Sequence, residues 1–343
     1  MAYLVTIGIP VYNVEKNIRQ TIDAALAQTF DSIEFLVVDD CGTDASMDIV
    51  RQYQQTHPRG SHIRILSQPR NMGIGAARNR MIAEAQGRYF FSFDADDTIP
   101  ADAISVLYEA ASRHDAELVY GSHERVTTDE EGNVVERMPY LYDKLVFTEP
   151  DSYANYAYSK GVQGMNWNYL ILLDVLRRNH LRITEVGHGY GEDFTFTIDL
   201  PTYVTRVVLL SQVTYHYYIY GVDKHHIRRT LHHEQMAKAV AAIDDKKRRS
   251  ELRTKPYYAQ RMARLMMIQC SFACKMVSRR DDFDVPFSPE EIRRVMWHPM
   301  SLWQILRSPQ SRMRNLLYKT IGVVPPRMSV WMLSMQDRRY GNA

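Results

Sequence analysis

The chain has 343 residues, of which 45% are hydrophobic and 24% charged, and its formal net charge is +2. This is the composition of a globular protein with one large domain or two, and the small net charge excludes binding to polyanions through overall charge. Its three cysteines, Cys41, Cys270 and Cys274, are too few for a disulfide scaffold and form no metal-ligand pattern, which favours a cytosolic compartment. No apolar run reaches the roughly 18 residues of a membrane span, and the N-terminus lacks a signal-peptide pattern.

The first 125 residues predict strands that alternate with helices. The predicted strands are apolar, β-rich runs at residues 3–12, 33–40, 63–68, 88–97 and 116–124. The predicted helices show amphipathic spacing at residues 15–30, 44–55, 75–85 and 101–115. Because these strands are almost continuously apolar, we expect an α/β fold with a mostly parallel central sheet covered by helices.

The pattern changes after about residue 125. The sequence predicts a polar hairpin or loop at 127–136 and helices at 147–161 and 165–181. One or two strands follow at 207–220, and the chain is expected to be mainly helical from about residue 230 onwards. We therefore expect an α/β domain over residues 1–225, divided near residue 125, followed by a helical region over 226–343.

Polar or aromatic side chains follow three of the predicted strands. The first strand ends at Pro10, Tyr12 and Asn13, the second at Asp39 and Asp40, and the fourth at Asp94, Asp96 and Asp97. Ligands of open parallel sheets bind at the carboxyl ends of the strands. A ring there can stack on a nucleobase, and a carboxylate can accept a hydrogen bond from a base or a ribose.

The acidic cluster in "FDADDT" has two interpretations. Three carboxylates within four positions repel one another, and a hard cation such as Mg²⁺ or Mn²⁺ would hold them together while also binding phosphates. Alternatively, Asp97 caps a helix and the other acids belong to a turn. The segment "NMGIGAARN" adds Gly73, Gly75 and Arg78 before a helix whose N-terminus favours anions, and Arg78 faces either a phosphate or a nearby acid.

Five segments in this order resemble the family 2 glycosyltransferases with the GT-A fold: "IPVYN", "VVDDCGTD", "NMGIGAARN", "FSFDADD" and "GEDFTF". The resemblance covers roughly residues 3–220, and it is specific as an ordered set although no single motif is. It implies a Rossmann-like nucleotide-binding part over 1–125, an acceptor-binding part over 126–225, and inverting transfer of a sugar from a nucleotide-sugar donor.

The resemblance also implies roles for individual residues. The donor would contact Pro10, Tyr12, Asn13, Asp39, Asn71, Gly75, Arg78, Asp94 and Ala95. Asp94 and Asp96 match the Asp-x-Asp motif and would hold Mn²⁺ or Mg²⁺ on the diphosphate, with Asp97 alongside and His216 as a further candidate ligand. Asp193 would be the base that deprotonates the acceptor, beside Glu192. Trp167 and Tyr169 would contact an acceptor sugar, or else belong to the core.

The sequence departs from the family pattern in two places. Gly42 stands where the family commonly has serine, so any hydroxyl contact there is lost. The Gln-x-x-Arg-Trp motif of processive members is not matched, because "QILRS" has serine at the last position. We therefore expect a stand-alone transferase of the capsule or exopolysaccharide type. UDP is the default donor nucleotide, the acceptor is a saccharide or a lipid-linked saccharide, and no nucleic acid is involved.

Several alternatives stay open. "DADDT" also fits the Asp-x-Asp-x-Thr motif of phosphatases and phosphomutases, although that motif normally follows the first strand. A nucleotidyltransferase and a degenerate nucleotide-sugar-binding module are further alternatives. His225–His226 with His232–His233 suggest a zinc site without a third fixed ligand. The C-terminal Arg, Trp and Met residues fit either contact with an anionic membrane or solvated helix faces. In the first case, a cytoplasmic enzyme would work at the inner face of the membrane.

Overall fold

The computed structural model describes residues 3–161, 165–187, 190–220 and 230–340. Its packing divides the chain into two compact units. The first, here called the sheet unit, consists of Met1–Tyr153, Met165–Glu185 and Leu200–Ile227; the second, the helical unit, consists of Ala154–Gly164, Val186–Asp199 and Arg228–Ala343. Two short segments of the expected acceptor-binding part, 154–164 and 186–199, thus pack with the C-terminal helices.

The sheet unit contains one mixed sheet. Its strands are β1 (Val5–Val11), β2 (Ile33–Asp39), β3 (Ile63–Ser67), β4 (Tyr89–Ser92), β5 (Leu118–Thr128), β6 (Val134–Tyr140), β7 (Leu145–Phe147), β8 (Tyr169–Leu172) and β9 (Val207–Tyr220). The order is β3-β2-β1-β4-β8-β5-β9-β7, and β6 pairs with β5. The strands β3, β2, β1 and β4 are parallel, as are β5 and β9, whereas β8, β6 and β7 pair antiparallel. This confirms the α/β fold class.

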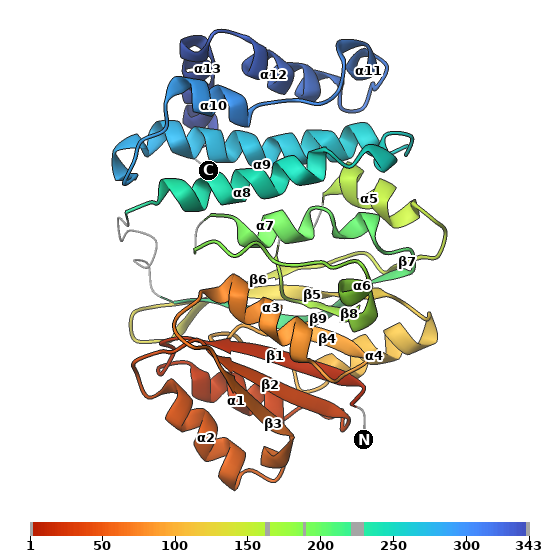
Figure 1. Ribbon diagram of the computed structural model, residues 1–343. Coiled ribbons are helices and arrows are strands. Elements are labelled where there is room, and N and C mark those ends of the chain that lie inside the picture. The colour runs from red at the N-terminus through yellow and green to blue at the C-terminus, as the bar shows by residue number, and fades with distance from the viewer. Residues whose placement is uncertain (1–2, 162–164, 188–189, 221–229, 341–343) are drawn as a thin grey trace. The chain divides into compact units, whose positions relative to one another are not determined.

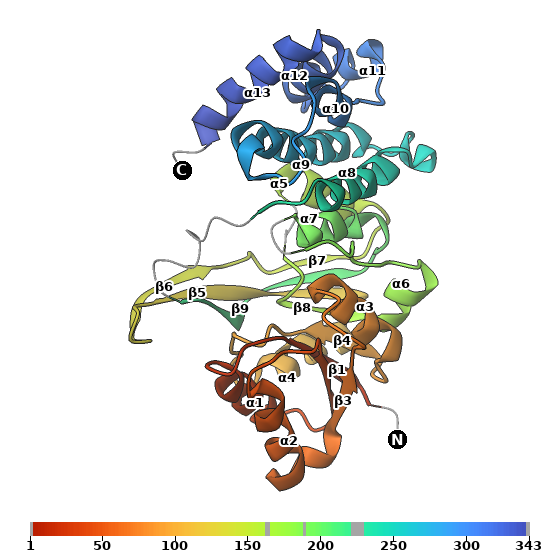
Figure 2. The same cartoon turned by 60° about the vertical axis from the view of Figure 1, so that its left-hand side comes forward.

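Helices cover both faces of this sheet (Figures 1 and 2). One face carries α1 (Ile18–Leu26), α2 (Ser46–Thr56) and α4 (Ala103–Arg113), and the other carries α3 (Ile74–Glu84) and α6 (Leu173–Arg178). In the sheet, β2 and β3 lie on one side of β1, and β4 lies on its other side. Because crossovers between parallel strands are right-handed, this change of side places α3 on the opposite face from α1 and α2. The alternating residues Val5, Ile7, Ile9 and Val11 of β1 are fully buried in the core beneath α1 and α4.

The predicted helix over 165–181 is wrong in its first half. Residues Tyr169–Leu172 form β8, which lies between β4 and β5 and pairs antiparallel with both; only Leu173–Arg178 is helical. A short apolar run such as "YLIL" has no periodicity that separates a buried strand from a buried helix. The fourth strand also ends earlier than predicted, at Ser92, so Asp94 and Asp96 lie in the loop that follows it. The predicted polar hairpin over 127–136 is confirmed as the connection of β5 to β6.

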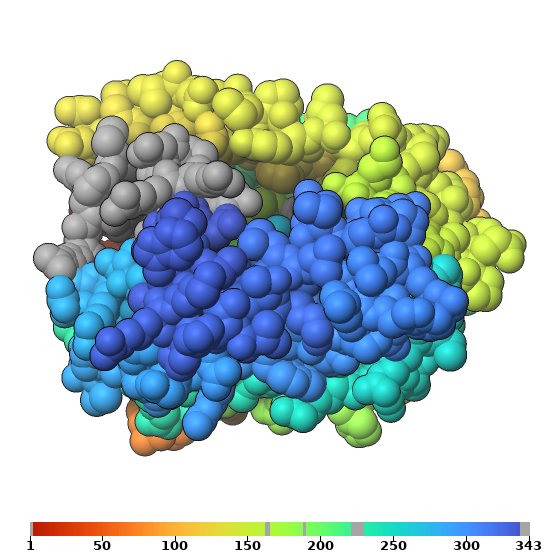
Figure 3. Space-filling view, turned by 90° about the horizontal axis from the view of Figure 1, so that it is seen from above, coloured from red at the N-terminus to blue at the C-terminus, as the bar shows by residue number. Residues whose placement is uncertain are grey.

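The helical unit confirms the expected helical C-terminal region. Its elements include α7 (Glu192–Thr197), α8 (His233–Lys247), α9 (Tyr258–Ser278), α10 (Pro289–Val295), α11 (Leu302–Leu306), α12 (Arg312–Val323) and α13 (Pro326–Tyr340), while α5 (Ser152–Lys160) begins in the sheet unit. Methionines such as Met262, Met266 and Met276 of α9 are fully buried in the core of this unit. Figure 3 shows the blue α12 and α13 on one face of the unit. In the described part of the chain, no helix combines the length and apolarity that a membrane crossing requires.

Candidate active site

The carboxyl end of β1 presents an exposed aromatic ring beside a constrained loop. Tyr12 is 45% exposed, so its ring is available for stacking. Asn13 has a positive φ of 50°, and its Oδ1 accepts a hydrogen bond from the Thr43 N–H at 2.7 Å. A Cβ atom at Gly42 would lie 2.9 Å from that Oδ1 atom. A serine at position 42 would therefore crowd the loop after β1.

The two acids at the carboxyl end of β2, Asp39 and Asp40, make different contacts. Asp39 lies at the strand end, and its Oδ1 accepts the Cys41 N–H at 2.9 Å. Asp40 is buried and accepts the N–H groups of Met72 and Gly73 at 2.8 and 2.9 Å, and burial raises the pKa of its carboxyl group. Asp40 thus fixes the loop that precedes α3.

That loop and the first two turns of α3 contain three predicted donor-binding residues. Asn71 Oδ1 accepts the Gly73 N–H at 3.0 Å, so its side chain shapes the loop. A Cβ atom at Gly75 would lie 2.8 Å from the Thr184 carbonyl oxygen, so the glycine allows a close approach of protein backbone. Arg78 is only 2% exposed and donates from Nη2 to Asp94 Oδ1 at 2.7 Å. Of the two partners considered for Arg78, the structure shows the acid.

The acids after β4 have different environments. The side chain of Asp94 is 19% exposed, Asp96 is half-buried, and Ala95 is buried in the hydrophobic core. Asp97 is 1% exposed: its Oδ2 accepts the Tyr215 hydroxyl at 2.8 Å and its Oδ1 accepts the Tyr218 N–H at 2.7 Å. Burial, and then the charges of Asp96 and Asp94, raise the pKa of Asp97 well above its usual value. Both oxygens of Asp97 are therefore engaged within the protein.

Of the four residues considered as metal ligands, only Asp94 and Asp96 are suited to a divalent cation. Among the described residues, no three His, Cys, Asp or Glu side chains gather as a metal site. His216 is joined through its backbone to Thr98, its Nδ1 lies 3.3 Å from Thr98 Oγ1, and burial lowers the pKa of its imidazole. Mg²⁺ characteristically takes one or two carboxylates and completes its shell with substrate phosphates and water. Asp94 and Asp96 match that donor set, whereas the hydrogen bonds of Asp97 give it a structural role.

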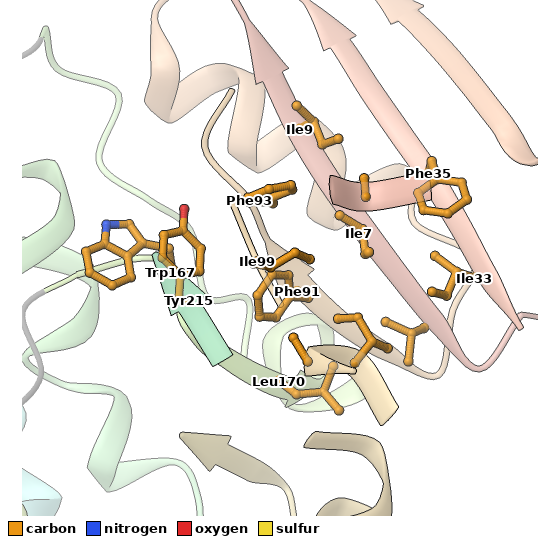
Figure 4. Packing of buried hydrophobic residues seen from close by; sticks show 14 of the residues in the cluster. Ile7, Ile9, Ile33, Phe35, Phe91, Phe93, Ile99, Trp167, Leu170 and Tyr215 are labelled. Carbon is orange, nitrogen blue, oxygen red and sulfur yellow. The ribbon is translucent and has the colours of Figure 1, made fainter. Parts of the chain in front are cut away.

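The two aromatic residues considered for the acceptor are buried. Trp167 is 3% exposed and stacks on Tyr215, with ring centroids 4.5 Å apart (Figure 4). It also stacks on Tyr217, with centroids 5.1 Å apart. Tyr169 is 4% exposed and packs edge-on against Tyr120 on the neighbouring strand. Of the two alternatives given above for these rings, the structure favours the core.

The acidic pair of "GEDF" starts α7 in the helical unit. Gly191 precedes it with a φ of +76°, and a Cβ atom there would lie 3.0 Å from the Phe272 ring. Glu192 is 7% exposed. The pKa of Lys275 is lowered by the burial of that lysine, and the negative charge of Glu192 partly offsets this effect. Asp193 is half-buried, and its carbonyl oxygen accepts the Thr197 hydroxyl at 2.9 Å. The segment ends at Asp199, a buried carboxylate that pairs with Arg261 and Arg249.

The histidines considered for zinc have other partners. His232 Nδ1 lies 2.8 Å from an Asp284 carboxylate oxygen, and the ring of His233 stacks on Phe287 with centroids 3.9 Å apart. His225 and His226 lie outside the described residues.

Comparison with known proteins identifies part of the chain. Residues 6–169 match Glycosyl transferase family 2. This segment, a little under half of the chain, carries a family 2 glycosyltransferase domain. The chain is 30% identical over 219 residues to the uncharacterized glycosyltransferase EpsJ of Bacillus subtilis. The aligned region covers 63% of this chain and 61% of EpsJ. The chain is 26% identical to the uncharacterized glycosyltransferase YibD of Escherichia coli, covering 64% and 63% of the two chains. Each match thus spans less than two thirds of the curated relative.

A solved structure resembles the fold over most of the chain. The structure of S. aureus TarS 1–349 in complex with UDP-GlcNAc has a TM-score of 0.59 at 17% identity and covers 92% of this chain and 90% of that one. At this identity the likeness concerns the fold alone, and it agrees with the expected GT-A architecture. The expectation of a glycosyltransferase is confirmed at the level of the family.

Two residues organise the site in ways that the sequence did not predict. Asp40 was identified only as an acid at a strand end, and its contact with the loop before α3 joins residues 32 positions apart. Tyr215 was not singled out, although it holds Asp97 and also receives the Asp94 N–H at 3.2 Å. The alternation in "VTYHYYIY" indicates that Tyr215 and Tyr217 share one face of a strand, but it does not show which loop that face meets.

Proposed function

We propose that the protein transfers a sugar from a nucleotide-sugar donor to a saccharide or lipid-linked acceptor, with inversion, in the synthesis of a capsule or exopolysaccharide. The main support is the convergence of Tyr12, Asp39 and the Arg78–Asp94 pair at the carboxyl ends of β1, β2 and β4 within a family 2 domain. The phosphatase alternative has no comparable support.

The donor's nucleoside would lie at the ends of β1 and β2. Tyr12 would stack on the base, Asn13 and Pro10 would border the pocket, and Asp39 would accept a hydrogen bond from the base or the ribose. UDP is the nucleotide we propose, and the complex of TarS with UDP-GlcNAc supports it as a fold-level precedent.

Asp94 and Asp96 would hold Mn²⁺ or Mg²⁺ on the donor diphosphate. Bound there, the ion supplies positive charge that stabilises the leaving nucleoside diphosphate. Arg78 positions Asp94, because its ion pair fixes one carboxylate oxygen of that residue. Asp97 holds the loop to β9 through Tyr215 and Tyr218.

Asp193 is the residue we propose as general base. A carboxylate that is half-buried can accept the proton of an acceptor hydroxyl as that oxygen attacks the anomeric carbon. Glu192, which is more deeply buried, would influence Asp193 and contact the acceptor less directly.

A lipid-linked acceptor would bring the protein to a membrane surface. The helical unit exposes apolar side chains together with arginines: Trp303 is 59% and Trp331 56% exposed, and Arg307 lies over the Trp303 ring. Interfacial segments combine tryptophan with basic residues in this way.

The test is an assay of UDP-sugar turnover with purified protein. The proposal predicts metal-dependent release of UDP that an acceptor saccharide accelerates. Binding of UDP without any turnover, with every acceptor and metal tried, would instead indicate a binding module.

A further inference from the structure

The helical unit contains a cavity of about 270 Å³ that the proposed function does not use. Its lining residues are Tyr158, Ser159, Gln260, Ala263, Arg264, Gln310, Ser311 and Arg314. A second recess of about 240 Å³ shares Gln260, Gln310 and Ser311 with it and adds Arg307. The two therefore adjoin, and none of the residues lining either one is acidic.

Two arginines line this cavity, and neither has an acidic partner in the part of the chain that the structure describes. Arg264 comes from α9 and Arg314 from α12, which pack against each other. Arg264 Nε donates to the Tyr158 carbonyl oxygen at 3.3 Å, and no ion pair is found for Arg264 or Arg314 among the described residues. Partial burial, and then the charge of Arg314, lower the pKa of Arg264. The positively charged side chains of Arg264 and Arg314 are thus held close together at the wall of the cavity.

The first turn of α12 adds further positive potential. It contains Arg312 and Arg314 and no acidic residue, although acids are favoured and cations disfavoured at the positive end of a helix. This turn works against the stability of the isolated helix. A local conflict of this kind is expected where a ligand provides the missing interaction.

We propose that this cavity binds a phosphate or diphosphate group through Arg264 and Arg314. Arginine forms paired hydrogen bonds with phosphate oxygens. The Gln310 amide, whose oxygen accepts a hydrogen bond from Gln260 Nε2, adds an N–H donor to the lining. The cavity has room for a diphosphate with some of its water, since a water molecule occupies about 30 Å³ in the liquid. The group belongs either to a soluble phosphate compound or to the headgroup of a lipid.

The test is calorimetric titration of the full chain with inorganic pyrophosphate, in EDTA so that metal-dependent donor binding does not contribute. Wild-type protein is expected to bind pyrophosphate more weakly as salt increases. Arg314→Gln should weaken binding about tenfold, and Arg264→Gln with Arg314→Gln should remove it. Arg314 is exposed, so the single variant is expected to fold even if Arg264→Gln is disruptive.

Two controls separate this cavity from the donor site. Arg312→Gln removes the same charge from the same turn without lining the cavity, and it should leave pyrophosphate affinity within about twofold. Asp39→Ala should lose UDP while it keeps pyrophosphate, and the double arginine variant should show the reverse. Failure of UDP binding alone would therefore count against the proposed function and leave the cavity proposal intact.

Vesicles of phosphatidylcholine with and without phosphatidylglycerol distinguish the two sources. Loss of vesicle co-sedimentation in the double variant would support a lipid headgroup, and unchanged co-sedimentation with lost pyrophosphate binding would support a soluble phosphate. Absence of pyrophosphate binding in the wild type, or equal binding in the double variant, would overturn the proposal.

Discussion

Arg78 and Asp94 form an ion pair with 2.7 Å between Nη2 and Oδ1, and Arg78 is almost completely buried while Asp94 remains partly exposed. The pair links α3 to the loop after β4. Its geometry presents a carboxylate at the strand end, held from behind by a cation that solvent hardly reaches. The metal and diphosphate site that we propose depends on this support.

Arg78→Met should therefore affect both stability and donor binding. Removing one partner of a buried pair leaves the other charge uncompensated, and we expect a loss of about 2–3 kcal/mol in the free energy of unfolding, discounted for the exposure of Asp94. Affinity for UDP with Mn²⁺ should fall as well. Denaturant unfolding and calorimetry measure the two effects. Arg51→Met, which breaks a surface pair with Asp48, is the control and should change stability by about 0.5 kcal/mol or less.

Substitutions of Asp97 distinguish a structural acid from a metal ligand. Asp97→Ala would leave the buried Tyr215 hydroxyl and Tyr218 N–H without an acceptor, at a cost of about 2–3 kcal/mol in unfolding free energy. Asp97→Asn keeps an oxygen for Tyr218 and should retain Mn²⁺-dependent UDP binding within about twofold. A loss of metal dependence in a stably folded Asp97→Asn variant would make Asp97 a ligand after all.

The raised pKa of Asp97 also predicts a pH effect. A carboxyl group whose pKa is higher in the folded than in the unfolded state binds its proton more tightly when folded. Its contribution therefore stabilises the protein at low pH and is lost as the pH rises through the folded-state pKa. Wild type minus Asp97→Asn stability, measured by urea unfolding across that range, should fall as the pH increases. A difference that is flat, or that rises with pH, would contradict the assignment.

Gly42→Ser restores the residue that the family commonly has, yet it should weaken donor binding. The new Cβ atom would lie 2.9 Å from Asn13 Oδ1 and 3.0 Å from Asn13 N, so the loop after β1 must shift. UDP affinity should drop several-fold, as measured by calorimetry, and Thr43→Ser, which keeps the backbone donor to Asn13, should not change it. Tighter binding by Gly42→Ser would show that the lost hydroxyl matters more than the loop contact.

Asp193→Asn tests the proposed base. Transfer should fall by about 10²–10⁴-fold, because the amide cannot accept the acceptor's proton. UDP affinity should stay within about twofold, since the donor-binding residues are in the other unit. Asp245→Asn, an exposed acid on α8, is the matched control. Turnover by Asp193→Asn at the wild-type rate would remove Asp193 from this role.

Much of the sheet unit is predictable from the sequence because its strands are long apolar runs between amphipathic helices. The strand β8 escaped prediction, since "YLIL" becomes a strand only by filling the space between β4 and β5. The strand-end residues Tyr12, Asp39 and Asp94 could be found because parallel strands end at one edge.

The partners of those residues could not be found in the same way. The contact of Arg78 with Asp94 depends on how α3 crosses the sheet, and the contact of Asp97 with Tyr215 spans 118 positions. Neither leaves a local pattern. The burial of Trp167 likewise depends on β9, whose tyrosines cover it.

The most direct test of the account is a thermal-shift titration of UDP, GDP, dTDP and CDP, each with and without Mn²⁺. A ligand that binds only the folded protein raises the melting temperature in proportion to RT ln(1 + [L]/Kd). We predict a shift with UDP that requires Mn²⁺ and disappears in Asp94→Ala. The absence of a shift with every nucleotide, in the presence of Mn²⁺, would contradict a donor site at the ends of β1, β2 and β4.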